Sequence, residues 1–159
     1  MYTSTALLDI HTRTQASLAA LFAHLATMEE GSLERSFAGF GYPTVRLQLH
    51  HMIGAEHYWI TLLEGRFVVT DEDAYPDLAS LLAYKEEVAG RGRSWLEGAS
   101  TEQLNEPATF ETWGGKEKVL VPAAVVMRTQ THHFTHLGQV LAMVRLMGHP
   151  VRGLDFPVE

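Results

Sequence analysis

Four long stretches of the sequence place apolar side chains every three or four residues, and this pattern limits most strongly what the chain can fold into. They cover residues 5–30, 44–65, 77–98 and 122–147. Such spacing puts the apolar side chains on one face of an α-helix, which is stable only when that face packs against other helices. The boundaries agree, because Ser4 and Asp77 can cap helix N-termini, Pro122 suits a first turn, and Gly148 ends a helix. The pattern predicts an all-α fold, a four-helix bundle.

Two interruptions of the helical pattern carry their own predictions. Residues 109–121 consist of two β-prone runs around a Gly-Gly turn, which predicts a small β-hairpin insert before the last helix. Residues 100–103 have the pattern of a capping box that opens a short turn. Gly90 and Gly92 weaken the middle of the third helix. No linker divides the chain, so residues 1–159 are predicted to form a single domain.

Composition narrows the class of protein further. The 159 residues include no cysteine, which excludes disulfides, thiolate nucleophiles and cysteine-based metal sites. The 12 basic and 19 acidic residues give a net charge of −7, which argues against a protein that binds nucleic acid by neutralising phosphates. No apolar run approaches the ~20 residues that cross a bilayer, and the N-terminal residues lack the pattern of a secretory signal. We therefore expect a cytoplasmic protein with no nucleic-acid or membrane partner.

The nine histidines are the residues whose placement decides the chemistry. On a helical wheel of residues 44–65, His51 falls within a broad apolar arc, whereas His50 and His57 fall on the opposite side with charged residues. We therefore expect His51 to face the interior, and His50 and His57 to be solvated. A lone buried histidine is more often a hydrogen-bonded core residue than a metal ligand, so His51 by itself predicts no site. No role is predicted for His11, His24 and His149.

The last helix strengthens the case for a metal site. His132 and His136 are four residues apart on an otherwise apolar face, which brings two imidazoles together as a shared ion requires. His133 lies at the edge of this face and is a weaker candidate. Two buried imidazoles need partners and disfavour each other's protonation, so the pair is harder to explain as ordinary core. With His51 from another helix, one shared metal ion is the simplest explanation, and hydrogen-bonded core histidines are the alternative.

Two motifs together resemble a known family. Residues 51–59 read HMIGAEHYW, and residues 132–139 read HHFTHLGQ. With the hairpin before the last helix, these motifs make the chain similar to the DinB/YfiT-like metalloenzymes, a family of four-helix bundles. The resemblance implies three metal ligands, at His51, His132 and His136. One departure concerns Leu137, which stands where many members have arginine, and it puts in doubt any role of that arginine in holding an anionic substrate or thiol.

The predicted donor set indicates what the site could do. A divalent ion held by three neutral imidazoles keeps its positive charge and at least one open coordination position, as in catalytic zinc sites. Such an ion lowers the pKa of a bound water or thiol, and zinc and nickel both suit imidazole ligands. The resemblance implies a metal-dependent transferase that uses a low-molecular-weight thiol, which must come from outside because the chain lacks cysteine. The alternatives are a metal-dependent hydrolase and a non-catalytic metal-binding stress-response module.

Further expectations concern the surroundings of the site and its partners. Glu56 lies too far around its helix from His51 to be an obvious ligand, and we expect it to form a salt bridge or outer-shell contact. Tyr58 shares the face of His51, and Thr129 lies one turn before the second histidine motif, so either could border the site, although core packing also accounts for both. The expected partners are a small-molecule substrate and a second copy of the chain. The methionines of residues 143–147 could serve the face of this homodimer, or they could fill the core.

Overall fold

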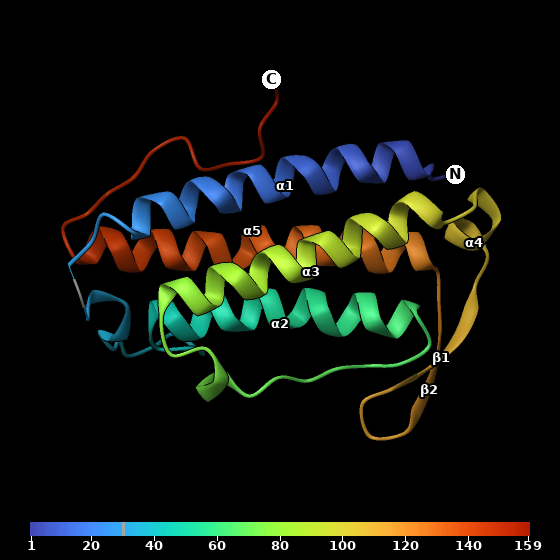
Figure 1. Cartoon of the computed structure of the whole chain (residues 1–159), viewed down its shortest axis with the longest axis horizontal. Helices are drawn as coiled ribbons and strands as arrows, with labels where there is room; N and C mark the ends of the chain where they lie inside the picture. The colour runs from blue at the N-terminus through green and yellow to red at the C-terminus, as the bar shows by residue number, and fades with distance from the viewer. Residues whose placement is uncertain (30) are drawn as a thin grey trace.

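The computed structural model describes residues 1–29 and 31–159 and shows a bundle of long helices with a small hairpin at one end (Figure 1). The four long helices are α1 (Ser4–Leu25), α2 (Val45–Leu63), α3 (Leu78–Gly98) and α5 (Pro122–Leu146). The shorter elements are the 3₁₀ turns η1 (Ser32–Glu34) and η2 (Glu72–Ala74), helix α4 (Thr101–Asn105), and strands β1 (Ala108–Thr112) and β2 (Lys116–Leu120). The predicted all-α four-helix bundle with a hairpin before the last helix is confirmed.

The long helices do not follow chain order around the bundle. Helix α3 packs against both α1 and α2, and α5 also packs against both. Helices α1 and α2 therefore lie diagonally opposite each other, although they are consecutive in the chain (Figure 1). This arrangement positions the candidate site, because α2 and α5 are direct neighbours and carry the two histidine motifs.

Side-chain caps explain where three of the long helices begin. Thr3, Thr44 and Asp77 accept hydrogen bonds from backbone N–H groups in the first turns of α1, α2 and α3. The expected cap at Asp77 is confirmed, and it forms a full capping box. The cap of α1 is Thr3 rather than the expected Ser4, because the hydroxyl of Ser4 donates instead to the carbonyl of Leu96.

Two helices differ in extent from the prediction. Helix α1 ends at Leu25, short of the expected end at Glu30, which itself lies outside the described residues. Gly31, which precedes η1, has a φ of 82°, a value that favours glycine. Helix α3 continues through Gly90 and Gly92 without a break, because its packing against α1 and α2 outweighs the low helix propensity of glycine.

The hairpin is attached to the helix that carries the first histidine motif. Strand β1 pairs antiparallel with β2, and Gly114 and Gly115 turn the chain with φ values of 76° and 70°. In this turn region, the backbone N–H of Trp113 donates to the hydroxyl of Tyr58 on α2 over 3.1 Å. The bond holds the hairpin beside α2, close to the predicted site.

The core of the bundle includes the methionines for which a dimer face was considered. Met143 is fully buried among apolar side chains of all four long helices, and Met147 packs against the same cluster. These methionines therefore fill the core, as the alternative held, and the homodimer stays a prediction. None of the described helices is long and apolar enough to span a membrane.

Candidate metal centre

His51 on α2 and His132 and His136 on α5 converge between the two helices. Each ring offers one nitrogen, and these three nitrogens lie within 4.8 Å of one another. The Nε2 atoms of His51 and His132 are 3.0 Å apart, close to the ~3.3 Å that separates two imidazole nitrogens bound to one tetrahedral zinc ion. We call these three residues the open cluster. No fourth His, Asp or Glu of residues 1–29 and 31–159 belongs to it.

The histidines of the open cluster are weak bases. Burial, followed by the positive charge of neighbouring histidines, lowers the pKa of His51 and of His132 to about 4. Burial also lowers the pKa of His136. At neutral pH the three rings are therefore uncharged, and each keeps a nitrogen lone pair. Three neutral imidazoles with converging nitrogens form a donor set that fits a divalent ion such as zinc or nickel.

A buried glutamine sets the orientation of His136. Nδ1–H of His136 donates to Oε1 of Gln48 over 2.7 Å, which leaves the Nε2 lone pair of His136 free for the open cluster. Gln48 is itself held, because its Nε2 donates to the side chain of Gln139 and to the carbonyl of Tyr42, each over 2.8 Å. Gln48 was not predicted from the sequence, although a polar residue one turn before His51 in an apolar stretch was an available signal.

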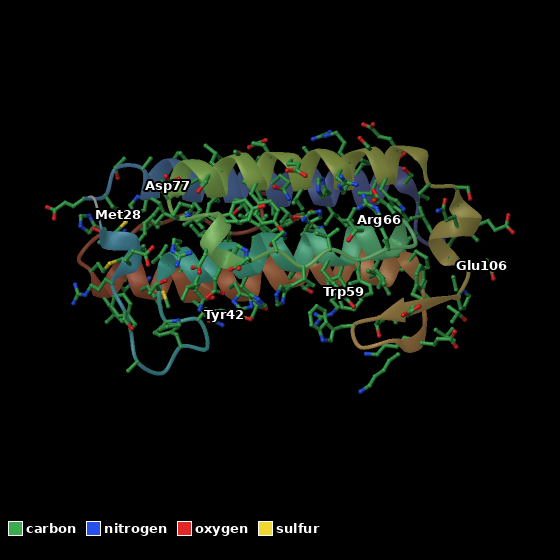
Figure 2. All side chains as sticks on the ribbon, turned by 60° about the horizontal axis from the view of Figure 1, so that its bottom comes forward. Met28, Tyr42, Trp59, Arg66, Asp77 and Glu106 are labelled. Atoms are coloured by element: carbon green, nitrogen blue, oxygen red, sulfur yellow. The ribbon has the colours of Figure 1, made fainter. Side chains whose placement is uncertain are left out.

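A pocket of about 350 Å³ opens beside the open cluster, and His51 and His132 line it. Tyr42 stacks on the ring of His51 with a centroid separation of 4.0 Å. Tyr58 lines the wall, as considered from the sequence. Trp59 also lines the pocket, and Figure 2 shows it on the same side of the bundle as Tyr42. A small molecule that enters this pocket therefore contacts two of the three histidines of the open cluster, His51 and His132.

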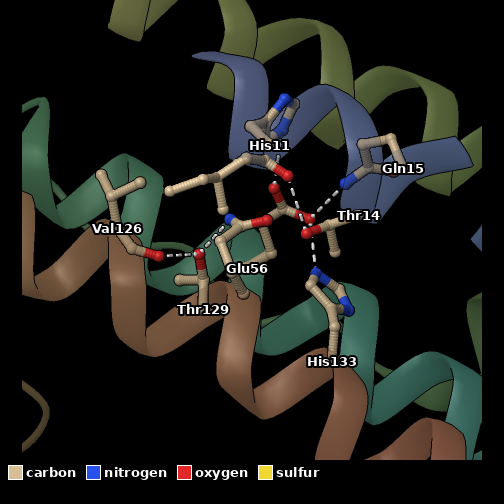
Figure 3. A network of polar contacts seen from close by, with 9 residues as sticks. His11, Thr14, Gln15, Glu56, Val126, Thr129 and His133 are labelled. Atoms are coloured by element: carbon tan, nitrogen blue, oxygen red, sulfur yellow. Dashed lines mark hydrogen bonds and ion pairs between the residues drawn. The ribbon is translucent and has the colours of Figure 1, made fainter. Parts of the chain in front are cut away.

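A second cluster of histidines lies in the interior of the bundle (Figure 3). Glu56 on α2 accepts hydrogen bonds from Nε2 of His11 on α1 over 3.1 Å and from Nε2 of His133 on α5 over 2.7 Å. The amide of Gln15 donates to the same carboxylate over 3.0 Å. Burial opposes ionisation of Glu56, but the two imidazoles outweigh it and lower the pKa of the carboxyl. We call His11, Glu56 and His133 the closed cluster.

The closed cluster was foreseen only in part. Glu56, for which a salt bridge or outer-shell contact was expected, lies at ion-pair distance from His133, and this weaker ligand candidate contacts Glu56 instead of joining the open cluster. His11 had no predicted role, yet it follows the buried Leu7 by one turn of α1, which was a signal that its ring points inward. Gly92 of α3 makes room for this ring, since a Cβ at that position would lie 3.1 Å from Nε2 of His11.

The prediction that His50 and His57 are solvated is wrong. His50 is 9% exposed and His57 is 7% exposed. They end a chain of hydrogen bonds in which His50 contacts the hydroxyl of Thr70 over 3.1 Å, Thr70 contacts Tyr84 over 3.0 Å, and Tyr84 contacts His57 over 3.0 Å. Helix α3 covers this side of α2, so a face that is polar on the helical wheel is buried against a tyrosine instead of water.

Two remaining residues of α5 take part in packing. Leu137, where arginine was noted in many members of the resembling family, is 2% exposed and packs in the apolar core. It does not line the pocket beside the open cluster. Thr129 is buried as well, and its hydroxyl donates to the carbonyl of Val126 and accepts from the amide of Gln130. Packing within the helix bundle thus accounts for Thr129.

Fold and site together define a class of protein: a four-helix bundle in which the second and the last long helix bring three histidines together, two of which line an open pocket. The model of the DinB family matches residues 1–159, and the chain belongs to this family. Comparison with curated protein sequences gave no match.

Among solved structures, YfiT from Bacillus subtilis is similar to this chain, with a TM-score of 0.63 and 18% sequence identity. The match covers 91% of this chain and 87% of YfiT. YfiT is described as a probable metal-dependent hydrolase with an unusual four-helix bundle topology. At this level of identity the similarity shows that the two proteins share the fold.

Proposed function

We propose that this chain binds one divalent metal ion through His51, His132 and His136 and uses it to activate a small nucleophile. The observation that carries the proposal is the convergence of three uncharged imidazoles, two of which line an open pocket. A divalent ion bound there supplies a Lewis acid that lowers the pKa of a water or thiol at its open position. A three-histidine group beside a pocket supports an enzyme over a non-catalytic stress-response module, which would need no room for a substrate.

The surrounding residues of this chain hold the site in shape. Gln48 fixes the ring of His136 through its Nδ1–H, so that Nε2 of that ring stays directed at the cluster. Tyr42 covers one face of the His51 ring. The aromatic wall formed by Tyr58 and Trp59 lowers the local dielectric constant and favours the apolar part of a substrate over water.

The candidate reactions differ in the nucleophile that the metal ion activates, which is either a thiol or water. The family resemblance supports a thiol-dependent transferase, and the required thiol is a separate small molecule because the chain contains no cysteine. The similarity to YfiT, described as a probable metal-dependent hydrolase, supports the alternative of a hydrolase, in which water takes the place of the thiol. Both reactions require the same three histidines and the same open position.

Elemental analysis of the purified chain tests the metal site. We expect about one equivalent of zinc or nickel per chain, and loss of that metal when His51, His132 and His136 are all replaced by alanine. A matched variant without His24 and His149, which lie outside the open cluster, should keep its metal. If the triple variant retains its metal, the three histidines are not its ligands and are ordinary core residues.

The reaction is tested by assaying the metal-loaded chain for conjugation with several bacterial thiols and for hydrolysis of esters and amides. Turnover that needs a thiol supports the transferase. Turnover without a thiol, abolished by His136→Ala, supports the hydrolase. If neither turnover nor binding of a thiol is found, the non-catalytic module is the better description.

A further inference from the structure

Arg128 is a cation of the pocket wall without a counter-charge. It lines the pocket together with His132, and its Cζ lies 5.2 Å from the centroid of the Trp59 ring, a cation–π distance. Four other arginines of the described chain form ion pairs with carboxylates, whereas Arg35, Arg93, Arg145 and Arg152, like Arg128, form none. No carboxylate of residues 1–29 and 31–159 lies within ion-pair distance of Arg128. Its positive charge is therefore available to a molecule in the pocket.

The side chain of Arg128 lies on the same side of α5 as His132 of the open cluster. Arg128 precedes His132 by one turn of α5, so both side chains project on the same side of the helix. The pocket also contains one acidic residue, Glu72. Among the described residues that line the pocket, Arg128 is the one arginine or lysine.

We infer that Arg128 recognises the anionic group of the substrate, and that this substrate is a small carboxylate with an apolar body. The inference rests on the proposed function, because it takes this pocket as the substrate site. A guanidinium binds a carboxylate through two parallel N–H donors. Stacking on Trp59 restricts the arginine before binding and so reduces the entropy lost when the anion binds. Tyr58 and Val68 supply the apolar wall for the rest of the molecule.

A pair of probes that differ only in charge tests the inference. The probes are 3-phenylpropanoate and its neutral amide, 3-phenylpropanamide, titrated into the full chain and followed by protein-detected NMR. Measurements on the zinc-loaded chain and on the chelator-treated chain separate binding to Arg128 from binding to the metal. We expect the carboxylate to bind about tenfold more tightly than the amide in both states, as a charge-assisted hydrogen bond predicts. This preference should shrink as the sodium chloride concentration rises.

Three variants isolate the arginine. Arg128→Gln should abolish the preference for the carboxylate and leave binding of the amide unchanged. Arg145→Gln is the matched control, since Arg145 is an exposed arginine of the same helix that does not line the pocket. It should keep the full preference. Glu72→Gln should strengthen binding of the carboxylate, because it removes a like charge from the pocket.

Several results would overturn the inference. Equal binding of the two probes to the wild-type chain would show that the pocket does not distinguish a carboxylate from a neutral amide. An equal loss in Arg128→Gln and Arg145→Gln would show a general effect of net charge. If the preference for the carboxylate is lost in the chelator-treated chain but kept in zinc-loaded Arg128→Gln, the metal ion and not Arg128 binds the carboxylate. Failure of the metal analysis would contradict the proposed function while leaving the result on the chelator-treated chain valid.

Discussion

His132 and His133 are adjacent in the sequence, yet they belong to clusters with different surroundings. His132 lies beside His51 and His136, its Nε2 3.0 Å from Nε2 of His51, and it lines the pocket. His133 donates to Glu56 in the interior, and His11 on α1 donates to the same carboxylate. One step of ~100° around α5 separates the two environments.

The difference between the clusters is the carboxylate. In the closed cluster Glu56 occupies Nε2 of both imidazoles, so neither nitrogen is available to an ion. In the open cluster no carboxylate of the described residues competes for the converging nitrogens. A histidine of this bundle is therefore structural where a buried acid binds its Nε2, and is a ligand candidate where that nitrogen faces other imidazoles and no carboxylate.

Breaking the closed cluster should have the largest effect on stability. In Glu56→Leu two imidazoles and the amide of Gln15 lose their acceptor in the interior. Each buried donor left without an acceptor costs about 1–3 kcal/mol of the free energy of unfolding. Urea denaturation of the metal-free chain measures this loss. Glu56→Gln, which keeps one acceptor oxygen, should lose less and provides a folded variant if the leucine variant does not fold.

The same variants sharpen the comparison when bound metal is measured. Glu56→Gln should retain about one equivalent of metal, because the open cluster does not use the carboxylate. The triple alanine variant of the open cluster should show the reverse, losing its metal with little change in the unfolding of the metal-free chain. Loss of metal in Glu56→Gln would mean that the two clusters are not separate in function.

The next effect concerns the orientation of one ring in the open cluster. In Gln48→Leu the Nδ1–H of His136 loses its acceptor, and the ring is free to turn its nitrogens. Loss of such an outer contact costs about 10–100-fold in metal affinity, which competition with a zinc chelator measures. Gln139→Leu removes only a partner of Gln48 and should cost less. Unchanged affinity in Gln48→Leu would show that the helices alone orient His136.

A smaller effect is expected where α3 meets the closed cluster. Gly92→Ala would place a Cβ 3.1 Å from Nε2 of His11 and 3.4 Å from Oε1 of Glu56. Because His11 is held by Glu56 and cannot move freely, we expect a net loss of about 1 kcal/mol in the free energy of unfolding. Gly90→Ala is the control, since no atom lies within 4 Å of its added Cβ. It should gain roughly 0.5–1 kcal/mol from helix propensity, and a similar gain at position 92 would contradict the tight packing.

The smallest effect is a pH dependence that should belong to the open cluster. Unfolded histidines have a pKa of ~6.5, whereas His51 and His132 have a pKa of about 4 in the folded chain. Below pH ~6.5 the unfolded state binds protons that the folded state does not, so acid favours unfolding. Stability of the metal-free chain should therefore fall from about pH 6.5 to about pH 4. Both rings are only half-buried, which keeps the effect modest.

Urea denaturation across this pH range checks the assignment. The triple alanine variant should show a shallower fall, because it lacks the two rings that take up the protons. The carboxyl of Glu56 stays ionised over the same range, since the neighbouring imidazoles hold its pKa low. An identical slope in the wild type and the triple variant would place the acid sensitivity elsewhere, for example at the buried His50 and His57.

The sequence by itself determined the helices, the hairpin and the three histidines that the structure brings together. These predictions succeed because they depend on local rules: apolar spacing along a helix, the cap at Asp77, and the Gly-Gly turn at Gly114. The i, i+4 spacing of His132 and His136 is likewise local, since four residues return the chain to the same face of a helix.

Only the tertiary structure decided which group each histidine contacts and through which ring nitrogen. Glu56 captures His11 and His133 because α1, α2 and α5 place three distant segments around one point. His50 and His57 are buried because α2 contacts both α3 and α5, which leaves a narrower exposed arc than a helical wheel assumes. These contacts depend on the distances between helices and on the rotamers of their side chains. The apolar periodicity of a single segment determines neither of them.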